Sequence, residues 1–132
     1  MSHENVDLVR RAIDAYSRQD WEALRDTCDP EIEWRSMEAL VGPGLIRGMA
    51  AAGKWLEDGQ RIFENLHIDI ERMIEREDRV VAVMKWMGRA RSSGVTAEMH
   101  FAQVFTIRDG RLLRVHDYRE PADALKAVGL QE

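Results

Sequence analysis

Residues 97–121, AEMHFAQVFTIRDGRLLRVHDYREP, predict two long antiparallel strands joined by a tight turn. Asp109 and Gly110 supply the turn, because glycine tolerates a positive φ and aspartate hydrogen-bonds its own backbone. Apolar and polar residues alternate on both sides of this turn, as they do in a strand with one buried face. The other predicted elements are positioned relative to this hairpin.

The alternation divides each strand of the hairpin into two faces. In the first strand the bulkier face is predicted to point into the core, and it holds Met99, Phe101, Gln103, Phe105 and Ile107. In the second strand hydrophobicity alone does not separate the two faces cleanly. The candidate for the inner face is the set Leu113, Val115, Asp117 and Arg119, and the other set is Leu112, Arg114, His116 and Tyr118. Gln103, Asp117 and Arg119 would then be polar groups in an apolar concavity. Buried polar groups need hydrogen-bond partners, so a functional site is expected at these residues.

Composition limits the class of protein. The 132 residues form one domain, 1–132, with 45% hydrophobic and 33% charged residues. A net charge of -5 argues against a nucleic-acid partner, which needs a basic face. The only cysteine, Cys28, excludes an internal disulfide, and no apolar run approaches the ~20 residues of a membrane span. The N-terminus lacks an apolar signal core, so we expect a cytoplasmic protein without membrane partners.

The remaining elements follow from periodicity and from capping residues. Helices are expected over about 6–16, 21–28, 49–63 and 121–130, with Ser2 or Asn5 capping the first and Asp20 the second. Strands are expected over 31–36, 66–70 and 80–91, and residues 41–48 are expected to form a rim loop. The order predicts an α+β domain in which helices lie on one side of a curved antiparallel sheet. Such a cone has an apolar pocket at its open end.

Several stretches resemble one known family. They are NVDLVRRAIDAYSRQDWEAL (5–24), DPEIEW (29–34), LIRG (45–48), HFAQVFTIRDGRLLRVHDY (100–118) and ADALKAVGL (122–130). With them the chain resembles the SnoaL-like branch of the nuclear transport factor two-like superfamily, which includes ketosteroid isomerase and limonene epoxide hydrolase. The resemblance implies a cystatin-like cone, closed by the N-terminal helices around an apolar pocket. It does not imply one function, because this fold hosts enzymes and binding modules.

Carried over from limonene epoxide hydrolase, the resemblance puts Asp117 where an aspartate activates water. The arginine and the second aspartate of that enzyme's triad fall at Met84 and Trp86, so epoxide hydrolysis by that route is not expected. In SnoaL-like polyketide cyclases a pocket carboxylate does acid–base work on an aldol closure, and Asp117 fits that role too.

Against ketosteroid isomerase, the general-base position falls near Trp34 and the oxyanion-hole tyrosine near Ala12, so both groups are missing. The oxyanion-hole acid falls at Gln103, whose amide is still able to donate a hydrogen bond. A site of this kind needs a base, and only Asp117 is available for it.

The predicted site therefore has Asp117 and Gln103 as catalytic residues. The residues predicted to bind substrate are Tyr16, Trp34, Met84, Trp86, Phe101 and Arg119. Two alternatives stay open: Asp117 forms an ion pair with an arginine (Arg119, Arg35 or Arg89), and Gln103 is only a buried amide. The histidines have no metal-ligand spacing, and neither a metal nor a cofactor is expected.

Three functions remain open from the sequence. The first is a cofactor-free lyase, isomerase or cyclase acting on a small hydrophobic carbonyl compound. The second is a pocket that binds an apolar metabolite without catalysis, and the third is an association module without activity.

The outer face of the sheet, with Ala102, Val104, Thr106, Val83 and Met87, is apolar enough to need cover. We therefore expect a two-fold homodimer through that face.

Overall fold

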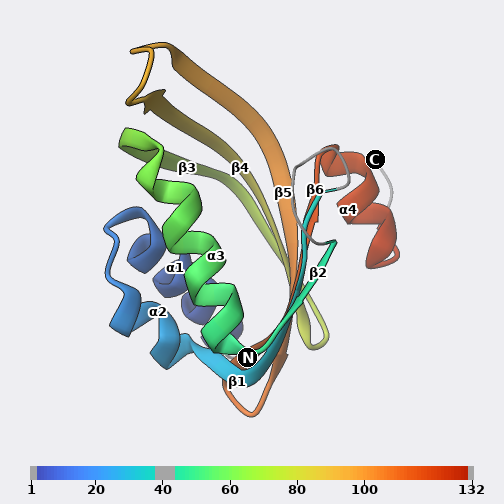
Figure 1. Cartoon of the computed structure of the whole chain (residues 1–132). Helices are drawn as coiled ribbons and strands as arrows, with labels where there is room; N and C mark the ends of the chain where they lie inside the picture. Colours follow the sequence, from blue (N-terminus) through green and yellow to red (C-terminus); the bar gives the residue numbers. More distant parts are fainter. Residues whose placement is uncertain (1–2, 38–43, 131–132) are drawn as a thin grey trace.

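The computed structural model describes residues 3–37 and 44–130, which form one curved sheet with helices on both of its faces (Figure 1). The elements are α1 (Glu4–Ser17), α2 (Trp21–Thr27), β1 (Cys28–Arg35), β2 (Leu45–Arg47), α3 (Met49–Arg61), β3 (Phe63–Arg76), β4 (Arg79–Ala90), β5 (Thr96–Arg108), β6 (Arg111–Tyr118) and α4 (Pro121–Ala127). The strand order is β2-β1-β6-β5-β4-β3. This confirms the α+β class and the curved sheet.

The hairpin predicted from residues 97–121 is β5 and β6. Its turn has positive φ at both Asp109 and Gly110, 53° and 74°, which matches the strand twist in a two-residue turn. A bulge follows in β6, because Thr106 lies opposite Arg114 whereas Ile107 lies opposite Leu112. Leu112 is consequently buried in the core and Leu113 is only half-buried. The prediction of an inner-facing Leu113 was therefore wrong.

Helices α1, α2 and α3 cover the concave face of the sheet, and the main core lies between them and the strands (Figure 1). The apolar stripe of α1 puts Leu8, Val9 and Ile13 into this core. Helix α3 adds Ala52 and Leu56. These helices thus enclose the inner face of β4, β5 and β6, where the predicted site lies.

Two features of the predicted sheet were wrong. The sheet is not purely antiparallel: β1 pairs with β6 in parallel, with Trp34 beside Val115. The chain turns away through β2 and α3 before β3, β4 and β5 bring it back, so β1 and β6 meet in the same direction. The predicted rim loop is also a strand in part, since Leu45–Arg47 is β2, while residues 41–43 lie outside the described residues.

The fourth helix lies on the opposite, convex face (Figure 1), so the helices do not all share one side as predicted. A second, smaller core forms there between Val81, Ala102 and Val104 of the sheet and Leu125 and Val128 of the C-terminal segment. The apolar patch that motivated the homodimer is thus covered in part within the same chain, at Ala102 and Val104, whereas Val83, Met87 and Thr106 stay half-buried. The homodimer stays a prediction.

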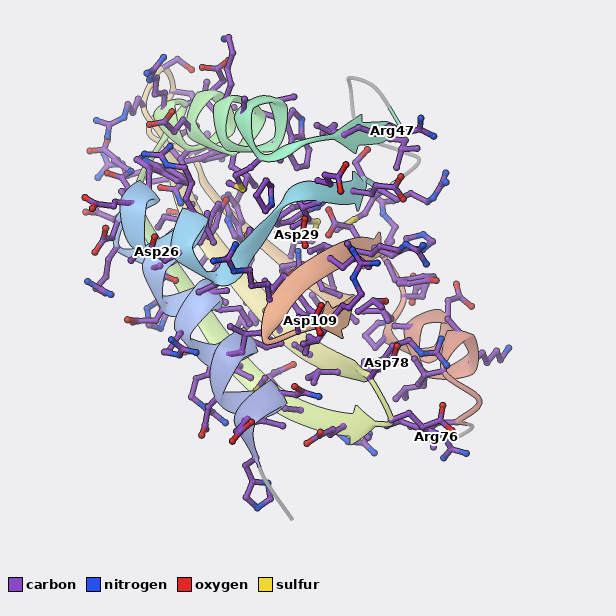
Figure 2. All side chains as sticks on the ribbon, turned by 90° about the horizontal axis from the view of Figure 1, so that it is seen from below. Asp26, Asp29, Arg47, Arg76, Asp78 and Asp109 are labelled. Carbon is purple, nitrogen blue, oxygen red and sulfur yellow. The ribbon has the colours of Figure 1, made fainter. Side chains whose placement is uncertain are left out.

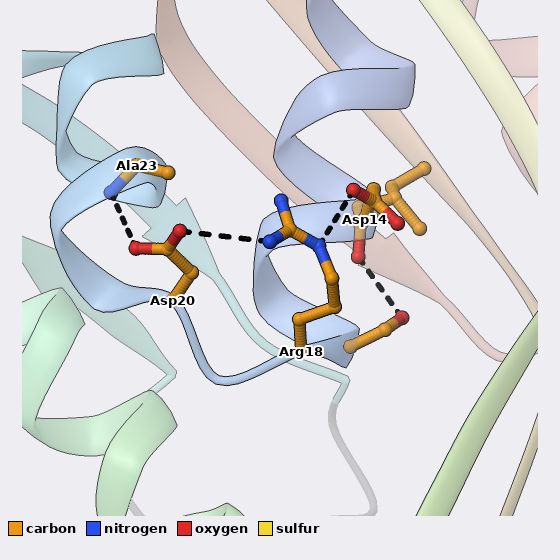
Figure 3. Close-up of polar contacts among 6 residues, drawn as sticks. Asp14, Arg18, Asp20 and Ala23 are labelled. Atoms are coloured by element: carbon orange, nitrogen blue, oxygen red, sulfur yellow. Dashed lines mark hydrogen bonds and ion pairs between the residues drawn. The ribbon is translucent and has the colours of Figure 1, made fainter.

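The corner between α1 and α2 is held by charge pairs and a cap (Figure 3). Asp20 accepts a hydrogen bond from the backbone N–H of Ala23 at 3.1 Å, which confirms the predicted N-cap of α2. Arg18 donates to Asp14 at 2.8 Å and lies 3.6 Å from Asp20. Neither predicted cap of α1 is seen: its N-cap is His3, Asn5 lies inside the helix, and residue 2 lies outside the described residues.

Charged side chains mark the ends of the strands (Figure 2). Arg76 and Asp78 lie at the turn between β3 and β4, on the side of α4, and Asp109 lies at the hairpin turn.

None of the helices formed by residues 3–37 and 44–130 is both long and apolar enough to cross a lipid bilayer.

Candidate functional site

Strand register places three inner-face residues in one row across the sheet. Ala82 of β4 lies opposite Gln103 of β5, and Gln103 lies opposite Asp117 of β6. Residues directly opposite in antiparallel strands share a face and lie within contact distance. The sequence prediction that Gln103 and Asp117 face the interior together is therefore seen in the structure.

The Asp117 carboxylate is held by two N–H donors. The Gln103 side-chain amide Nε2 donates to Oδ1 at 2.8 Å, and the Trp34 indole Nε1 donates to Oδ2 at 3.0 Å. Trp34 reaches Asp117 because it lies beside Val115, two residues before Asp117 on the same face. Asp117 is 8% exposed, Gln103 9% and Trp34 7%. The carboxylate is thus enclosed, and each of its oxygens accepts a hydrogen bond.

Burial raises the pKa of Asp117 from 3.8 to about 6, and the hydrogen bonds from Gln103 and Trp34 oppose the increase. No arginine lies among these causes, and no ion pair joins Asp117 to an arginine in the described residues. The alternative pairings with Arg119, Arg35 or Arg89 are therefore not seen. A carboxyl group with this pKa is present in both protonation states near neutral pH.

The predicted substrate-binding residues divide into two groups. Met84 and Phe101 are buried and lie opposite each other on β4 and β5, next to the row of Asp117. Trp86 is half-buried, and its ring meets that of Phe63 edge-on with centroids 4.7 Å apart. Arg119, in contrast, follows the end of β6 and is exposed. It does not join the interior group, because the strand alternation that would turn it inward stops at Tyr118.

Helix α3 adds two residues to this interior that the sequence prediction left out. Trp55 packs edge-on against Trp34 with centroids 6.0 Å apart. Gln60 is 2% exposed, and its Nε2 donates to the backbone carbonyl oxygen of Tyr16. The signal for Gln60 was present in the sequence: it lies four residues after Leu56, on the apolar stripe of the helix.

The hydroxyl of Tyr16 lies in the same interior. Burial raises its pKa, hydrogen bonds from the Gln60 and Trp86 side chains oppose this increase, and the charge of Asp117 adds to it. The carboxylate is thus near enough to act on the tyrosine electrostatically. Gln60 itself is bonded to the backbone carbonyl oxygen of Tyr16.

Two hollows of the described surface lie away from the predicted site, since neither is lined by a predicted site residue. One, of about 270 Å³, lies between the end of α1 and the start of β3; its lining includes Ser17, Arg18, Phe63, Asn65 and Arg91. The other, of about 210 Å³, lies between α1 and α2. The interior around Asp117 is packed with buried side chains instead. The apolar pocket at Asp117 therefore stays a prediction.

Three of the four histidines lie on the outer face of the sheet, and the fourth, His3, precedes α1. His67 is within 2.7 Å of Asp69, and His100 lies 3.4 Å from Glu71. His116 is half-buried and stacks on Tyr118 at 4.1 Å. Within residues 3–37 and 44–130, no three histidine, cysteine, aspartate or glutamate side chains are grouped so that they could hold a metal ion.

The model of a known protein family matches most of this chain. The model of the SnoaL-like domain matches residues 9–115. The chain belongs to the SnoaL-like family. The match covers both strands of the hairpin up to Val115 and includes Trp34 and Gln103. No curated protein matches this SnoaL-like chain.

Solved structures share the fold of this SnoaL-like protein at low sequence identity. The structure of TerC co-crystallized with polyporic acid superposes with a TM-score of 0.79 at 22% identity, over 95% of this chain and 97% of that chain. An NTF2-like protein from Burkholderia xenovorans gives 0.74 at 23% identity, over 98% of each chain. A protein with a ketosteroid isomerase-like fold from Catenulispora acidiphila, in complex with trimethylamine, gives 0.75 at 16% identity, over 93% and 92%. These likenesses show the NTF2-like fold.

Proposed function

We propose that this SnoaL-like protein catalyses cofactor-free proton transfer on a small hydrophobic carbonyl compound, with Asp117 as the general base. One observation carries the proposal: the Asp117 carboxylate is buried, held by two neutral N–H donors, and has a pKa raised to about 6. A buried carboxylate that no cation compensates costs stability, so its retention inside the core needs a reason. A poised base supplies that reason.

The proposed chemistry assigns each polar group one task. Asp117 removes a proton from the carbon next to the substrate carbonyl, and it returns the proton at the end of the reaction. Gln103 holds Asp117 through one amide N–H, and its second N–H polarises the carbonyl oxygen as negative charge develops there. Trp34 fixes the orientation of the carboxylate. Such steps belong to isomerases, lyases and aldol cyclases.

The relatives support a small-molecule ligand in general terms. The TerC crystals were grown with polyporic acid, and the Catenulispora acidiphila protein was in complex with trimethylamine. This support concerns those proteins and extends to the present chain only through the shared fold. Met84 and Phe101 supply the apolar walls in the proposal, whereas Arg119 is left out because it is exposed.

The test uses 2-tetralone, an apolar ketone with acidic protons next to its carbonyl. Exchange of these protons with solvent in D₂O is followed by NMR in the presence of the protein. We expect the parent chain to accelerate exchange and Asp117→Asn to abolish the acceleration, because the amide cannot take up the proton. The rate should increase with pH through about 6, as Asp117 ionises.

Asp69→Asn is the matched control, since Asp69 is an exposed carboxylate on the outer side of the sheet. It should exchange the tetralone protons at the parent rate. The proposal fails if the parent gives no acceleration, or if Asp117→Asn and Asp69→Asn keep the same rate.

The second candidate is an association module without activity. The packed interior favours it, because Asp117, Gln103 and Trp34 are all less than a tenth exposed. The predicted homodimer belongs to this candidate, although α4 covers part of the apolar patch first assigned to it. Light scattering at micromolar concentration should give twice the 15.2 kDa of one chain. A mass near that of one chain would contradict the dimer.

A further inference from the structure

One row of residues crosses the outer face of the sheet, with one member on each strand. Each member is paired with the next in the strand register, and residues directly opposite on neighbouring strands share a face. The member on β5, Thr106, follows the inward-facing Phe105, so the row lies on the convex face. From β2 to β3 its members are Arg47, Glu33, Arg114, Thr106, Arg79 and Arg76. We call these six residues the arginine row.

Most of the arginine row is open to solvent. Arg47, Arg114 and Arg76 are exposed, whereas Arg79 is half-buried and donates from Nη1 to the backbone carbonyl oxygen of Ala127 at 3.0 Å. Helix α4 packs beside the row, on the apolar residues of the smaller core. Figure 2 shows Arg47 and Arg76 on the same side of the sheet as α4. The row is therefore accessible next to α4.

The charge of the row is opposite in sign to that of the chain. The chain carries a net charge of -5, whereas the row has four arginines and one carboxylate, that of Glu33. Exposed Arg35 lies two residues further along β1, beside His116. Burial lowers the pKa of His116, and the positive charge of Arg35 lowers it further. The turn at residues 77–78 adds two carboxylates, so this part of the surface stays positive.

Two pairs of arginines lie directly opposite each other at this end of the sheet. Arg76 of β3 opposes Arg79 of β4, and Arg108 of β5 opposes Arg111 of β6. Like charges in this arrangement destabilise a sheet. Among the described residues, no carboxylate lies within ion-pair distance of Arg76 or Arg79. The stability of the fold does not explain these arginines, whereas an anion bound across them would remove the repulsion.

Glu33 shows how a carboxylate fits into the row. Its Oε2 lies 3.7 Å from Nε of Arg47, and its Oε1 lies 3.7 Å from Nε of Arg114. These distances exceed those of a hydrogen bond, so both guanidinium groups keep donors for further acceptors. Thr106 takes the equivalent place between Arg114 and Arg79, and it carries a hydroxyl in place of a charge. An oxyanion from another molecule fits that place.

We propose that the arginine row is a docking surface for an acidic segment of a partner protein. The row spans five inter-strand spacings of about 4.8 Å, or roughly 24 Å, which is too long for one phosphate or carboxylate group. A polypeptide segment with several aspartate or glutamate residues matches both the length and the spread of charge. Nucleic acid matches less well, because the row is a single line of charge on a chain of net charge -5. This surface goes beyond the proposed function, since it lies on the face opposite to Asp117.

The experiment uses fluorescently labelled octaglutamate, with binding followed by fluorescence anisotropy. Extended at ~3.3 Å per residue, this peptide is about as long as the row. We expect it to bind the parent chain, and to bind less tightly as salt is added, because exposed charges are screened. Arg114→Gln should weaken binding about fivefold, the effect of one well-placed exposed ion pair. Adding Arg76→Gln should bring the loss to about 25-fold, since the two sites are well separated.

Arg10→Gln and the double variant Arg10→Gln/Arg25→Gln are the matched controls. Both arginines are exposed on the helices of the opposite face, and their loss changes the net charge by the same amount. These controls should bind octaglutamate as tightly as the parent. Thermal melts check that every variant is folded, and Arg47→Gln replaces Arg114→Gln if the latter is not. The row variants should exchange the tetralone protons at the parent rate, so that docking and catalysis are tested separately.

The docking surface is supported if the row variants lose affinity and the control variants keep it. It is overturned if octaglutamate does not bind the parent, or if row and control variants bind it equally. It is also overturned if labelled octathymidylate binds the parent at least as tightly as octaglutamate, because the row would then be assigned to nucleic acid. A light-scattering mass of two chains for the parent and of one chain for Arg114→Gln would assign the row to a second copy, and would overturn the proposal as well.

Discussion

The two faces of the sheet are packed in different ways. The convex face meets α4 through small and branched apolar side chains such as Ala102, Val104 and Leu125. The concave face meets α1, α2 and α3 through a larger core that also contains Asp117, Gln103 and Gln60. Both faces are carried by the same strands, so packing alone does not require the buried polar groups. They are the part of the molecule to be explained by function.

The largest expected effect is on the concave face itself. Phe105 is 2% exposed, and Phe105→Ala should lower the free energy of unfolding by about 3–5 kcal/mol, since the α-helices cannot collapse onto the space left. Urea denaturation measures this difference. Phe63→Ala is the control, because the half-buried Phe63 ring should cost clearly less. Equal costs would show that the concave core is loosely packed near β5.

The convex core should be weaker, since the seven-residue α4 packs on one small patch. Leu125→Ala should lower the free energy of unfolding by about 2–3 kcal/mol, at the lower end for a buried leucine. The exposed neighbour Lys126 gives the control, with Lys126→Ala expected within about 0.5 kcal/mol of the parent. A Leu125 effect as large as that of Phe105 would remove the contrast between the faces.

Asp117→Asn tests whether the charged Asp117 carboxylate destabilises the folded protein at neutral pH. Because the folded pKa is raised from 3.8 to about 6, the folded state binds more protons than the unfolded state between these values. The contribution of Asp117 to stability is therefore largest below about pH 4 and is lost as the pH rises through 6. At pH 8 the variant should be more stable by up to about 3 kcal/mol, the free energy of a pKa difference of about two.

The Asn side chain fits this site, since its oxygen can accept from Trp34 while its amide N–H donates to a turned Gln103 amide. Thermal melts of parent and variant at pH 4 and pH 8 check the prediction. A variant that melts lower at pH 8 would mean that Asp117 stabilises the fold as a charged group, and the general-base proposal would lose its argument.

The smallest expected effect is a change in the pKa of Asp117 when the indole N–H of Trp34, its donor from β1, is removed. Trp34→Phe removes one of the two hydrogen bonds that favour the charged form, so the pKa of Asp117 should increase from about 6 toward about 7. NMR titration of the carboxyl carbon measures this value. Trp55→Phe keeps a ring against Trp34 but changes no bond to Asp117, so it should leave the pKa unchanged. The same increase in both variants would assign the effect to burial rather than to the indole N–H.

Much of the candidate site followed from the sequence. Strand alternation placed Gln103 and Asp117 on one inner face, because the period of two is fixed by the backbone and the Asp109-Gly110 turn sets the register. Alternation did not predict that β6 contains a bulge, which exchanged Leu112 and Leu113. It also predicted that Arg119 points inward, although that residue lies past the end of β6. Local periodicity cannot say where a strand stops or skips a residue.

The residues that complete the interior come from distant parts of the chain. Trp34 is 83 positions from Asp117, and Gln60 is 44 positions from Tyr16. The sequence marked both as members of apolar stripes, but it could not show that the indole N–H replaces an arginine as the partner of Asp117. That choice depends on the parallel pairing of β1 with β6.

The sequence thus determined the α+β class, the hairpin of β5 and β6, the inward direction of Gln103 and Asp117, and the cap at Asp20, because these depend on side-chain period, on turn chemistry and on neighbours a few residues away. Only the tertiary structure decided which face α4 covers, which donors hold Asp117, and that Gln60 keeps an unpaired oxygen. The physical reason is that burial and hydrogen bonding are properties of surfaces brought together. Each depends on groups from several elements at once, and no single stretch of sequence contains them all.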